Sequence, residues 1–182
     1  MNRIMIVDDE SNVLKALRRL LLSVPCSYGC LSYQLEVETF TTPAAALERA
    51  AQQPFDLFMS DYRMPGMNGV EFLAQVRKIQ PDAARLIISG YADLNAFADA
   101  VNGADIFRFL SKPWNDYVLV SAIAQALNYR ELMLENRELA ARASVERVTM
   151  SKRTPPADDA APKVRWGPDG SAIIDAPTPD AE

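Results

Sequence analysis

Residues 55–69 read FDLFMSDYRMPGMNG, an apolar run that ends at Ser60 and Asp61 and leads into a turn rich in Pro and Gly. The run is typical of a buried strand, and Gly69 to Ile79 has the apolar spacing of a helix. A carboxylate at the junction of a strand and a turn either initiates the turn or belongs to a functional site. The rest of the sequence decides between these two interpretations.

The same alternation of strand and helix repeats on both sides of this stretch. The predicted strands are RIMIV (3–7), VETF (37–40), DLFMS (56–60), RLIIS (85–89) and IFRFL (106–110). The first predicted helix follows Ser11 as its N-cap, and the second begins at Thr42-Pro43. The third spans Gly69–Ile79, the fourth spans Asp93–Asn102, and the fifth begins near Asn115. Each crossover between parallel strands lays its helix on one face of the sheet. The pattern therefore predicts a doubly wound α/β domain with a five-stranded, mainly parallel sheet.

The C-terminal part differs in composition. The last predicted helix runs without Pro or Gly past Val148, so it is roughly twice as long as an average helix. From about Thr149 the chain is rich in Ser, Lys, Pro, Asp and Ala and lacks the apolar residues of a core. Within this part, residues 163–174 alternate apolar residues about a Pro-Asp-Gly turn and favour a short hairpin. We expect a globular domain at 1–128, a helical extension at 129–148 and a disordered tail at 149–182.

Composition excludes several functional classes. The formal charge of −5, without a basic run, disfavours nucleic-acid binding, which needs a basic face. No apolar run approaches the ~18 residues of a membrane span, and the N-terminal MNRIMIVDDE reaches carboxylates too early for a secretory signal. We therefore expect a cytoplasmic protein that binds neither nucleic acid nor membrane. The chain contains no His, which excludes imidazole metal sites and Ser-His or Cys-His catalysis.

Cys26 and Cys30 lie in an unusually long connection between Pro25 and Leu35. Two thiolates without further ligands make a poor zinc site, and disulfides are rare in cytosolic proteins. We therefore expect two unpaired thiols with structural roles.

Polar residues follow the predicted strands at the edge of the sheet where parallel strands end. Asp8 and Asp9 follow the first strand, Asp61 the third, Ser89 the fourth and Lys112 the fifth. In open α/β sheets the functional crevice lies at this edge. Three carboxylates gathered there repel one another unless a cation intervenes, and Mg²⁺ prefers oxygen ligands. A carboxylate beside Mg²⁺, a lysine and a hydroxyl can accept a phosphoryl group, which favours the functional interpretation of Asp61.

Four segments carry a resemblance to a known family. They are IVDDE (6–10), SDYRMPGMNGVEFL (60–73), LIISGYAD (86–93) and FLSKPW (109–114). With these segments in this order and at this spacing, residues 1 to about 130 resemble the receiver domain of two-component response regulators. The resemblance implies a flavodoxin-like fold with strand order 2-1-3-4-5. The long last helix, predicted from the absence of Pro and Gly, adds a C-terminal extension to this fold.

The resemblance also implies roles for individual residues. Asp61 is the implied phosphoacceptor, and Lys112 contacts the phosphoryl group. The implied Mg²⁺ ligands are Asp8, Asp9, Asp61 and the backbone carbonyl of Arg63. Ser89 and Phe109 are the implied switch residues, and the bond before Pro113 is expected to be cis. Two features depart from the family: the long connection that holds the cysteines, and Phe109 in place of a Tyr whose hydroxyl forms a hydrogen bond.

The predicted function is that of a phosphorylation-dependent response regulator. A sensor histidine kinase or phosphotransfer protein donates the phosphoryl group to Asp61, and the switch residues reshape a face that binds an unknown downstream protein. The chain is then a phosphoacceptor and not an enzyme with a separate substrate. Three alternatives remain. They are an aspartate-dependent phosphatase, whose nucleophile is expected in a D-x-D pattern after the first strand, a phosphorylation-independent scaffold, and the receiver fragment of a larger regulator with an output domain.

The helical extension has a short heptad pattern. Tyr129, Asn136 and Ala143 take a positions, and Leu132 and Leu139 take d positions. A single Asn at an a position favours a two-stranded, in-register pair. We expect a homodimer through a short parallel coiled coil. The alternative is a helix that folds back onto the domain or remains single.

Overall fold

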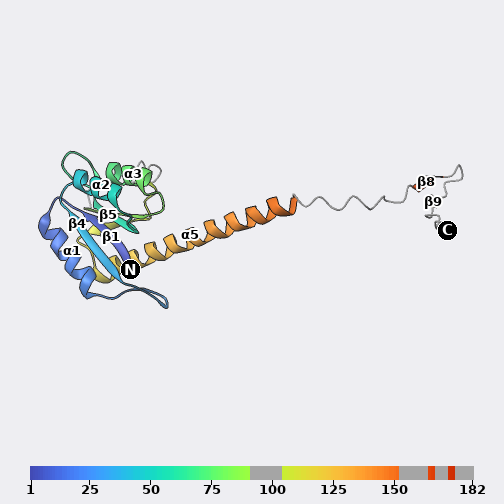
Figure 1. The fold of residues 1–182 in the computed structure, drawn as a ribbon. Coiled ribbons are helices and arrows are strands. Elements are labelled where there is room, and N and C mark those ends of the chain that lie inside the picture. The colour runs from blue at the N-terminus through green and yellow to red at the C-terminus, as the bar shows by residue number, and fades with distance from the viewer. Residues whose placement is uncertain (91–103, 152–163, 167–171, 175–182) are drawn as a thin grey trace. The chain divides into compact units, whose positions relative to one another are not determined.

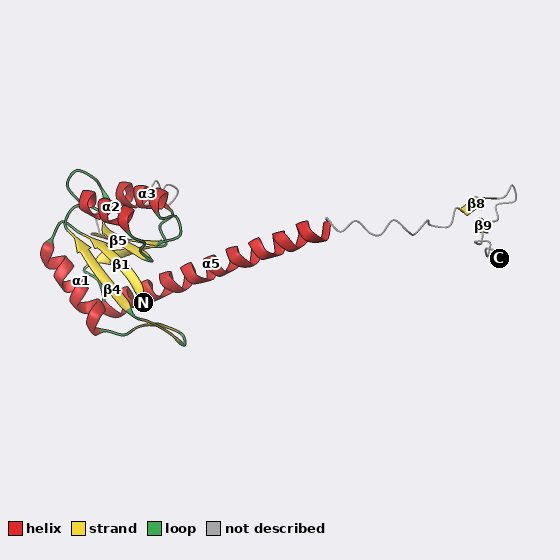
Figure 2. Ribbon diagram, in the orientation of Figure 1, coloured by secondary structure: helices red, strands yellow, loops and turns green. Residues whose placement is uncertain are grey.

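A five-stranded parallel sheet forms the centre of the fold. In this computed structural model, which describes residues 1–90, 104–151, 164–166 and 172–174, the strand order of this sheet is β4-β1-β5-β6-β7. The strands are β1 (Asn2–Val7), β4 (Leu35–Phe40), β5 (Leu57–Asp61), β6 (Ala84–Gly90) and β7 (Arg108–Lys112). Neighbouring strands of this sheet are parallel. The order confirms the predicted flavodoxin-like arrangement (Figure 2).

Helices cover both faces of the sheet (Figure 1). They are α1 (Ser11–Ser23), α2 (Pro43–Gln52), α3 (Gly69–Ile79) and α5 (Asp116–Ser151). Alternate side chains of β1 point to opposite faces of the sheet. Ile4 and Ile6 pack in one apolar layer with α1 and α5, whereas Met5 and Val7 pack in the other with α2 and α3. All four side chains are fully buried, so the sheet is enclosed by two apolar layers.

Short polar side chains explain where two of the helices begin. The Asn68 side chain accepts a hydrogen bond from the Glu71 amide at 2.9 Å, and the Glu71 side chain accepts one from the Asn68 amide at 3.1 Å. This reciprocal capping box starts α3 at Gly69, as predicted. Thr42 caps α2, whose first residue is Pro43, a position where its missing N–H costs nothing.

Several predicted boundaries differ from the structure by one or two residues, and two of these differences have a visible cause. Glu10, not Ser11, is the N-cap residue of α1. The Asp8 carboxylate holds the Glu10 amide at 2.9 Å, and so turns the chain one residue earlier than predicted. The last strand of the sheet spans Arg108–Lys112 instead of 106–110, because its pairing with β6 continues into polar residues that the apolar pattern excluded.

The long connection after α1 folds into an antiparallel hairpin that the sequence pattern did not reveal. Its strands are β2 (Cys26–Tyr28) and β3 (Leu31–Tyr33), joined by Gly29 and Cys30. Gly29 has a φ of +58°, a left-handed conformation that glycine adopts without strain. The available signal is weak, because apolar residues alternate with Ser on each side of this glycine over only three residues. Both cysteines are free thiols, as predicted, and Cys30 is exposed.

The C-terminal part is described by itself. The chain divides into two units, Met1–Glu138 and Leu139–Glu182, and α5 begins in the first and ends in the second. In the second unit, β8 (Val164–Trp166) pairs antiparallel with β9 (Ala172–Ile174). The predicted helix at 93–102 and most of the predicted tail lie outside the described residues. Among the helices of the described ranges, none has the length and apolar character needed to cross a membrane.

Candidate functional site

The carboxyl ends of β1, β5 and β7 bring three of the predicted site residues into contact. The ammonium nitrogen of Lys112 lies 2.7 Å from Asp8 Oδ2 and 2.5 Å from Asp61 Oδ1. Asp8 directly follows β1, Asp61 ends β5, and Lys112 ends β7. Asp8 and Asp61 are buried, with 1% and 7% of their surface exposed, and Lys112 is partly buried. One lysine therefore joins two buried carboxylates at the predicted edge of the sheet.

Backbone amides fix the second oxygen of each carboxylate. Asp61 Oδ2 accepts a hydrogen bond from the Arg63 amide at 2.7 Å, and Asp8 Oδ1 accepts one from the Glu10 amide at 2.9 Å. These bonds come from residues just after each carboxylate, so the local turn determines which way the carboxylate points. The two acidic side chains are thereby held in place before any ligand binds.

Gly69 is a residue of the site that the sequence analysis assigned only to a helix. A Cβ at this position would lie 2.1 Å from the carbonyl oxygen of Asp61, a contact that no side chain permits. The Gly69 amide also donates to the Tyr62 carbonyl at 2.9 Å and closes the loop. The sequence offers one signal for this role. Glycine destabilises a helix, so a glycine in the first turn of the helix indicates that another constraint selects it.

The charges at this edge are unbalanced, because two carboxylates face one ammonium. Burial raises the pKa of the Asp61 carboxyl above its ordinary value; the bond from Lys112 opposes this shift, and the charge of Asp8 adds to it. Burial lowers the pKa of Lys112, but its bonds to Asp61 and Asp8 outweigh burial and raise that pKa above its ordinary value. A site in which one carboxylate lacks a counter-charge attracts a further cation.

The donor set suits a hard divalent cation. Asp8 and Asp61 both contact the Lys112 ammonium and therefore lie close together, and carboxylate oxygen is the ligand that Mg²⁺ prefers. Asp9 is exposed, and the described residues contain no group of three or more His, Cys, Asp or Glu side chains placed to hold a metal. The three-carboxylate magnesium site stays a prediction, for which the structure brings two of the three carboxylates together.

The predicted switch residues lie on neighbouring strands. Ser89 of β6 pairs in register with Ser111 of β7, and its hydroxyl donates to the Gly90 carbonyl at 3.2 Å. Ser89 is buried, whereas Phe109 is partly buried and packs against the apolar layer of α2 and α3. The peptide bond between Lys112 and its following proline is cis, as the family resemblance implies. Both switch candidates therefore lie on strands that reach the edge where Asp61 ends β5.

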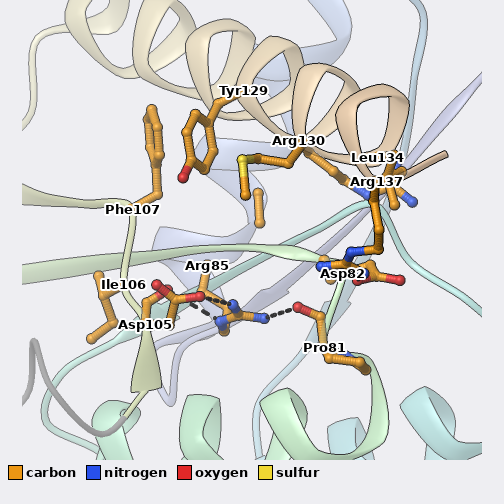
Figure 3. Close-up of a pocket in the computed structure, with 13 residues that line it drawn as sticks. Pro81, Asp82, Arg85, Asp105, Ile106, Phe107, Tyr129, Arg130, Leu134 and Arg137 are labelled. Atoms are coloured by element: carbon orange, nitrogen blue, oxygen red, sulfur yellow. Dashed lines mark hydrogen bonds and ion pairs between the residues drawn. The ribbon is translucent and has the colours of Figure 1, made fainter. Parts of the chain in front are cut away.

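A cavity of about 300 Å³ lies at the opposite, amino edge of the sheet, between β6, β7 and α5 (Figure 3). Its arginines already have acidic partners. The pairs are Arg85 with Asp105, Arg130 with Asp56, and Arg137 with Asp82. The rings of Phe107 and Tyr129 also meet there, with centroids 5.3 Å apart. Because each arginine has a carboxylate of its own, this edge is electrically balanced and serves to hold α5 against the sheet.

Comparisons with known proteins point to one family. The family model of the response regulator receiver domain matches residues 4–124. The hydrogenase transcriptional regulatory protein HoxA of Cupriavidus necator is 34% identical over 129 residues, which are 71% of this chain and 25% of that protein. The response regulator receiver protein CpdR of Brucella abortus is 33% identical over 129 residues, which are 70% of this chain and 98% of that protein. The match thus spans about a quarter of HoxA and nearly all of CpdR.

A solved structure agrees with these sequence relatives in fold. The crystal structure of an uncharacterized protein from Neptuniibacter caesariensis has a TM-score of 0.65 and 41% sequence identity to this chain. The alignment covers 74% of this chain and 93% of that chain. The uncovered part of this chain is comparable in size to its C-terminal extension.

Proposed function

The chain belongs to the family of response regulator receiver domains, and we propose that it is a phosphorylation-dependent regulator whose phosphoacceptor is Asp61. The observation that carries this proposal is the contact of the Lys112 ammonium with both Asp61 and Asp8. Asp61 is buried, oriented by the Arg63 amide, and held beside a cation that can bind phosphoryl oxygens. These features support Asp61 as a nucleophile.

The proposed donor is a phosphohistidine on a sensor histidine kinase or a phosphotransfer protein. An oxygen of Asp61 attacks the phosphorus; the O–P bond forms as the N–P bond of the donor breaks, and the donor imidazole leaves with the electron pair and takes up a proton. Lys112 neutralises negative charge on the transferred oxygens, because its ammonium already lies at the attacking carboxylate. The protein is the phosphoacceptor in this reaction and requires no separate small-molecule substrate.

The proposed ligands of Mg²⁺ are Asp8, Asp9, Asp61 and the backbone carbonyl of Arg63. A bound ion supplies positive charge that attracts the phosphoryl group and stabilises its oxygens. Asp8 and Asp61 carry two negative charges and contact one cation, the Lys112 ammonium, and the net negative charge that remains supports the binding of a second cation. The two buried carboxylates repel each other less when such a charge lies between them.

Ser89 and Phe109 are the proposed switch residues. In the unphosphorylated chain the Ser89 hydroxyl makes a long bond of 3.2 Å to a neighbouring carbonyl. A phosphoryl group on Asp61 offers charged oxygens, which accept stronger hydrogen bonds than a neutral carbonyl does. Movement of Ser89 toward the phosphoryl group frees space for Phe109 to change position, and the outer face then differs for a downstream protein.

Phosphoryl uptake tests the proposal. The parent protein and Asp61→Asn are incubated with Mg²⁺ and radiolabelled acetyl phosphate, and Asp82→Asn, at the opposite edge, is the matched control. We expect label on the parent and on Asp82→Asn, none above background on Asp61→Asn, and loss of label from the parent when a chelator removes Mg²⁺. Equal labelling of the parent and Asp61→Asn would show that the assignment is wrong.

We further propose that the regulator forms a homodimer through α5. Leu132 and Leu139, the predicted d positions, are 49% and 55% exposed. Arg130 and Arg137 anchor the helix at the amino edge (Figure 3). Each of the two leucines follows one of these arginines by two residues and so lies about 200° from it around the helix axis. The anchored side and the exposed stripe are therefore separate. Sedimentation that finds only monomer at micromolar concentration would contradict the dimer.

The downstream partner is proposed to be a protein of unknown identity in the cytoplasm, where the phosphoryl donors are expected. The match covers a quarter of HoxA, which is named a transcriptional regulatory protein, and nearly all of CpdR, which is named a receiver protein. A receiver within a longer regulator and a stand-alone receiver are therefore both candidates. Pull-down with and without beryllofluoride, a phosphoryl mimic, identifies a partner that binds only the activated form.

A further inference from the structure

The hairpin formed by β2 and β3 has one apolar face. Cys26 pairs with Tyr33 at its base, and Tyr28 pairs with Leu31 at its tip, so these four side chains share a face while the two Ser residues occupy the other. Cys26 and Tyr33 are 2% and 8% exposed, whereas Tyr28 and Leu31 are 45% and 42% exposed. The apolar face therefore begins in the core and continues into solvent.

The base of the hairpin packs on α5. The Tyr33 hydroxyl donates to Glu131 Oε2 at 3.3 Å, and the Cys26 thiol donates to the Val120 carbonyl at 3.9 Å. Figure 2 shows the hairpin projecting from the edge of the sheet at which β4 begins. Leu132 follows Glu131 by one residue, about 100° further around the helix. The hairpin thus borders the exposed stripe of α5.

We propose that the hairpin tip packs against α5 of a second copy of the chain and forms one wall of the dimer interface. This inference rests on the homodimer proposed above and adds the surface that completes it. In a two-fold dimer the same patch of both copies meets, so a surface beside the stripe of one copy faces the helix of the other. Each α5 then lies against its partner's helix and its partner's hairpin.

The area of the α5 stripe alone is too small for a stable dimer. The stripe residues Leu132 and Leu139 are about half exposed, and so are Tyr129 and Met133, which line the cavity at the amino edge. Together they offer roughly 200 Å² of apolar surface, at ~100 Å² for each fully exposed side chain. Specific interfaces bury about 800 Å² per partner, of which a little over half, roughly 450 Å², is apolar. A dimer that uses this stripe has to include a neighbouring apolar surface, and the hairpin tip provides one.

Asn136 favours a second copy of this chain over a different protein. It lies between Leu132 and Leu139 in the stripe, and its amide finds both a donor and an acceptor in the same residue of an identical helix. Residues 25–34 contain no charged side chain, so the hairpin brings no like charge toward a second copy. The surface therefore fits the exposed apolar stripe of an identical helix and presents no charge to a strongly acidic or basic partner.

Sedimentation equilibrium of full-length variants separates the hairpin from the helix. The tip variant carries Tyr28→Ser with Leu31→Ser, and its matched control carries Ser27→Thr with Ser32→Thr on the opposite face of the hairpin. We expect the tip variant to dimerise at least tenfold more weakly than the parent, and the control to dimerise like the parent. Phosphoryl uptake by the tip variant at the parent's rate verifies that its receiver domain is folded.

A helix variant, Leu132→Glu with Leu139→Glu, distinguishes the two proposals. If this variant is monomeric while the tip variant dimerises like the parent, the role of the hairpin is overturned and the α5 dimer stands. If the parent itself is monomeric, both the dimer and the role of the hairpin are overturned. Uptake of label at Asp61 tests the receiver function separately from either result.

Cys30 gives a second readout that leaves the tip side chains unchanged. Its thiol is exposed at the turn of the hairpin, while Cys26 is buried, so a benzophenone maleimide labels Cys30 selectively. Irradiation is expected to produce a cross-linked dimer in which Cys30 is joined to residues 131–137 of the second copy. Links confined to one chain, or to another region of the second copy, would overturn the inference.

Discussion

Both edges of the sheet hold ion pairs, but the ratio of cationic to acidic side chains differs between them. At the carboxyl edge one ammonium, that of Lys112, serves two buried carboxylates, Asp8 and Asp61. At the amino edge each arginine that lines the cavity has its own carboxylate, as Arg85 has Asp105. A balanced pair holds elements together, whereas an uncompensated buried charge perturbs pKa values and attracts ligands. The proportion of charges therefore separates the reactive edge from the structural one.

Removal of the Lys112 ammonium is expected to have the largest effect, and this effect is on the rate of phosphoryl uptake. Lys112→Met leaves Asp61 and Asp8 without a counter-charge, so the rate of phosphoryl uptake should fall by about two to three orders of magnitude. Lys78→Met, at an exposed position of α3, is the matched control and should keep the parent's rate. Initial rates of labelling by acetyl phosphate measure both variants. Equal rates for Lys112→Met and the parent would remove Lys112 from the reaction.

The next largest effect is expected at the amino edge, on stability instead of chemistry. The Arg85 side chain is almost fully buried and donates to the Ala104 carbonyl at 2.8 Å, the Pro81 carbonyl at 3.1 Å and Asp105 Oδ2 at 2.9 Å. Arg85→Met should lower the free energy of unfolding by about 2–4 kcal/mol, because these acceptors lose their donor. Arg137→Met, which removes an exposed pair, should lower it by less than about 1 kcal/mol.

Urea unfolding measures both arginine variants. The folded fraction of each should take up phosphoryl groups at the parent's rate, because neither arginine lies at the carboxyl edge. A slow rate for folded Arg85→Met would break the separation between the two edges. Equal losses of stability for the two variants would show that burial does not distinguish the pairs.

The smallest expected effect comes from the raised pKa of Asp61. A carboxyl whose pKa is higher in the folded than in the unfolded state stabilises the fold at low pH, and this contribution is lost as the pH rises from 3.8 through the folded pKa. Asp61→Asn removes this ionisation and should gain stability relative to the parent over that range. The net gain in the free energy of unfolding is about 1 kcal/mol or less, because the substitution also takes from Lys112 one of its two partners, and this loss offsets part of the gain. Urea unfolding across this range of pH tests the sign. A variant whose free energy of unfolding falls relative to that of the parent as the pH rises would contradict the prediction.

The sequence predicts the carboxyl edge better than the amino edge for a physical reason. Asp8, Asp61 and Lys112 each follow an apolar strand, and parallel strands end at one edge, so local patterns suffice to bring them together. Arg85 lies inside an apolar run, and its partner Asp105 lies in a turn with a φ of 51°. No local pattern encodes that pairing, because it depends on how two distant segments pack.

The hairpin and the glycine of the site were missed for similar reasons. Strands of three residues are too short for a periodic pattern, so the sequence predicts only a long connection where β2 and β3 lie. Gly69 fits the start of a helix by position, and only the structure shows the Asp61 carbonyl where a Cβ would be. Local sequence therefore predicted elements and strand ends, while close approaches required the folded chain.

A single peptide allows the most direct measurement of the central claim. Trypsin releases residues 50–63, which contain two aspartates at opposite ends of β5. Asp56 lies at the amino edge, just before the strand, and Asp61 is the last residue of the strand, at the carboxyl edge. Borohydride reduces a phosphorylated aspartate to homoserine, and fragmentation of the peptide in a mass spectrometer locates that residue. We expect homoserine at Asp61 and an unmodified Asp56 after treatment with acetyl phosphate and Mg²⁺. Homoserine at Asp56, or at neither position in a protein that carries label, would contradict the assignment of the carboxyl edge as the site of phosphorylation.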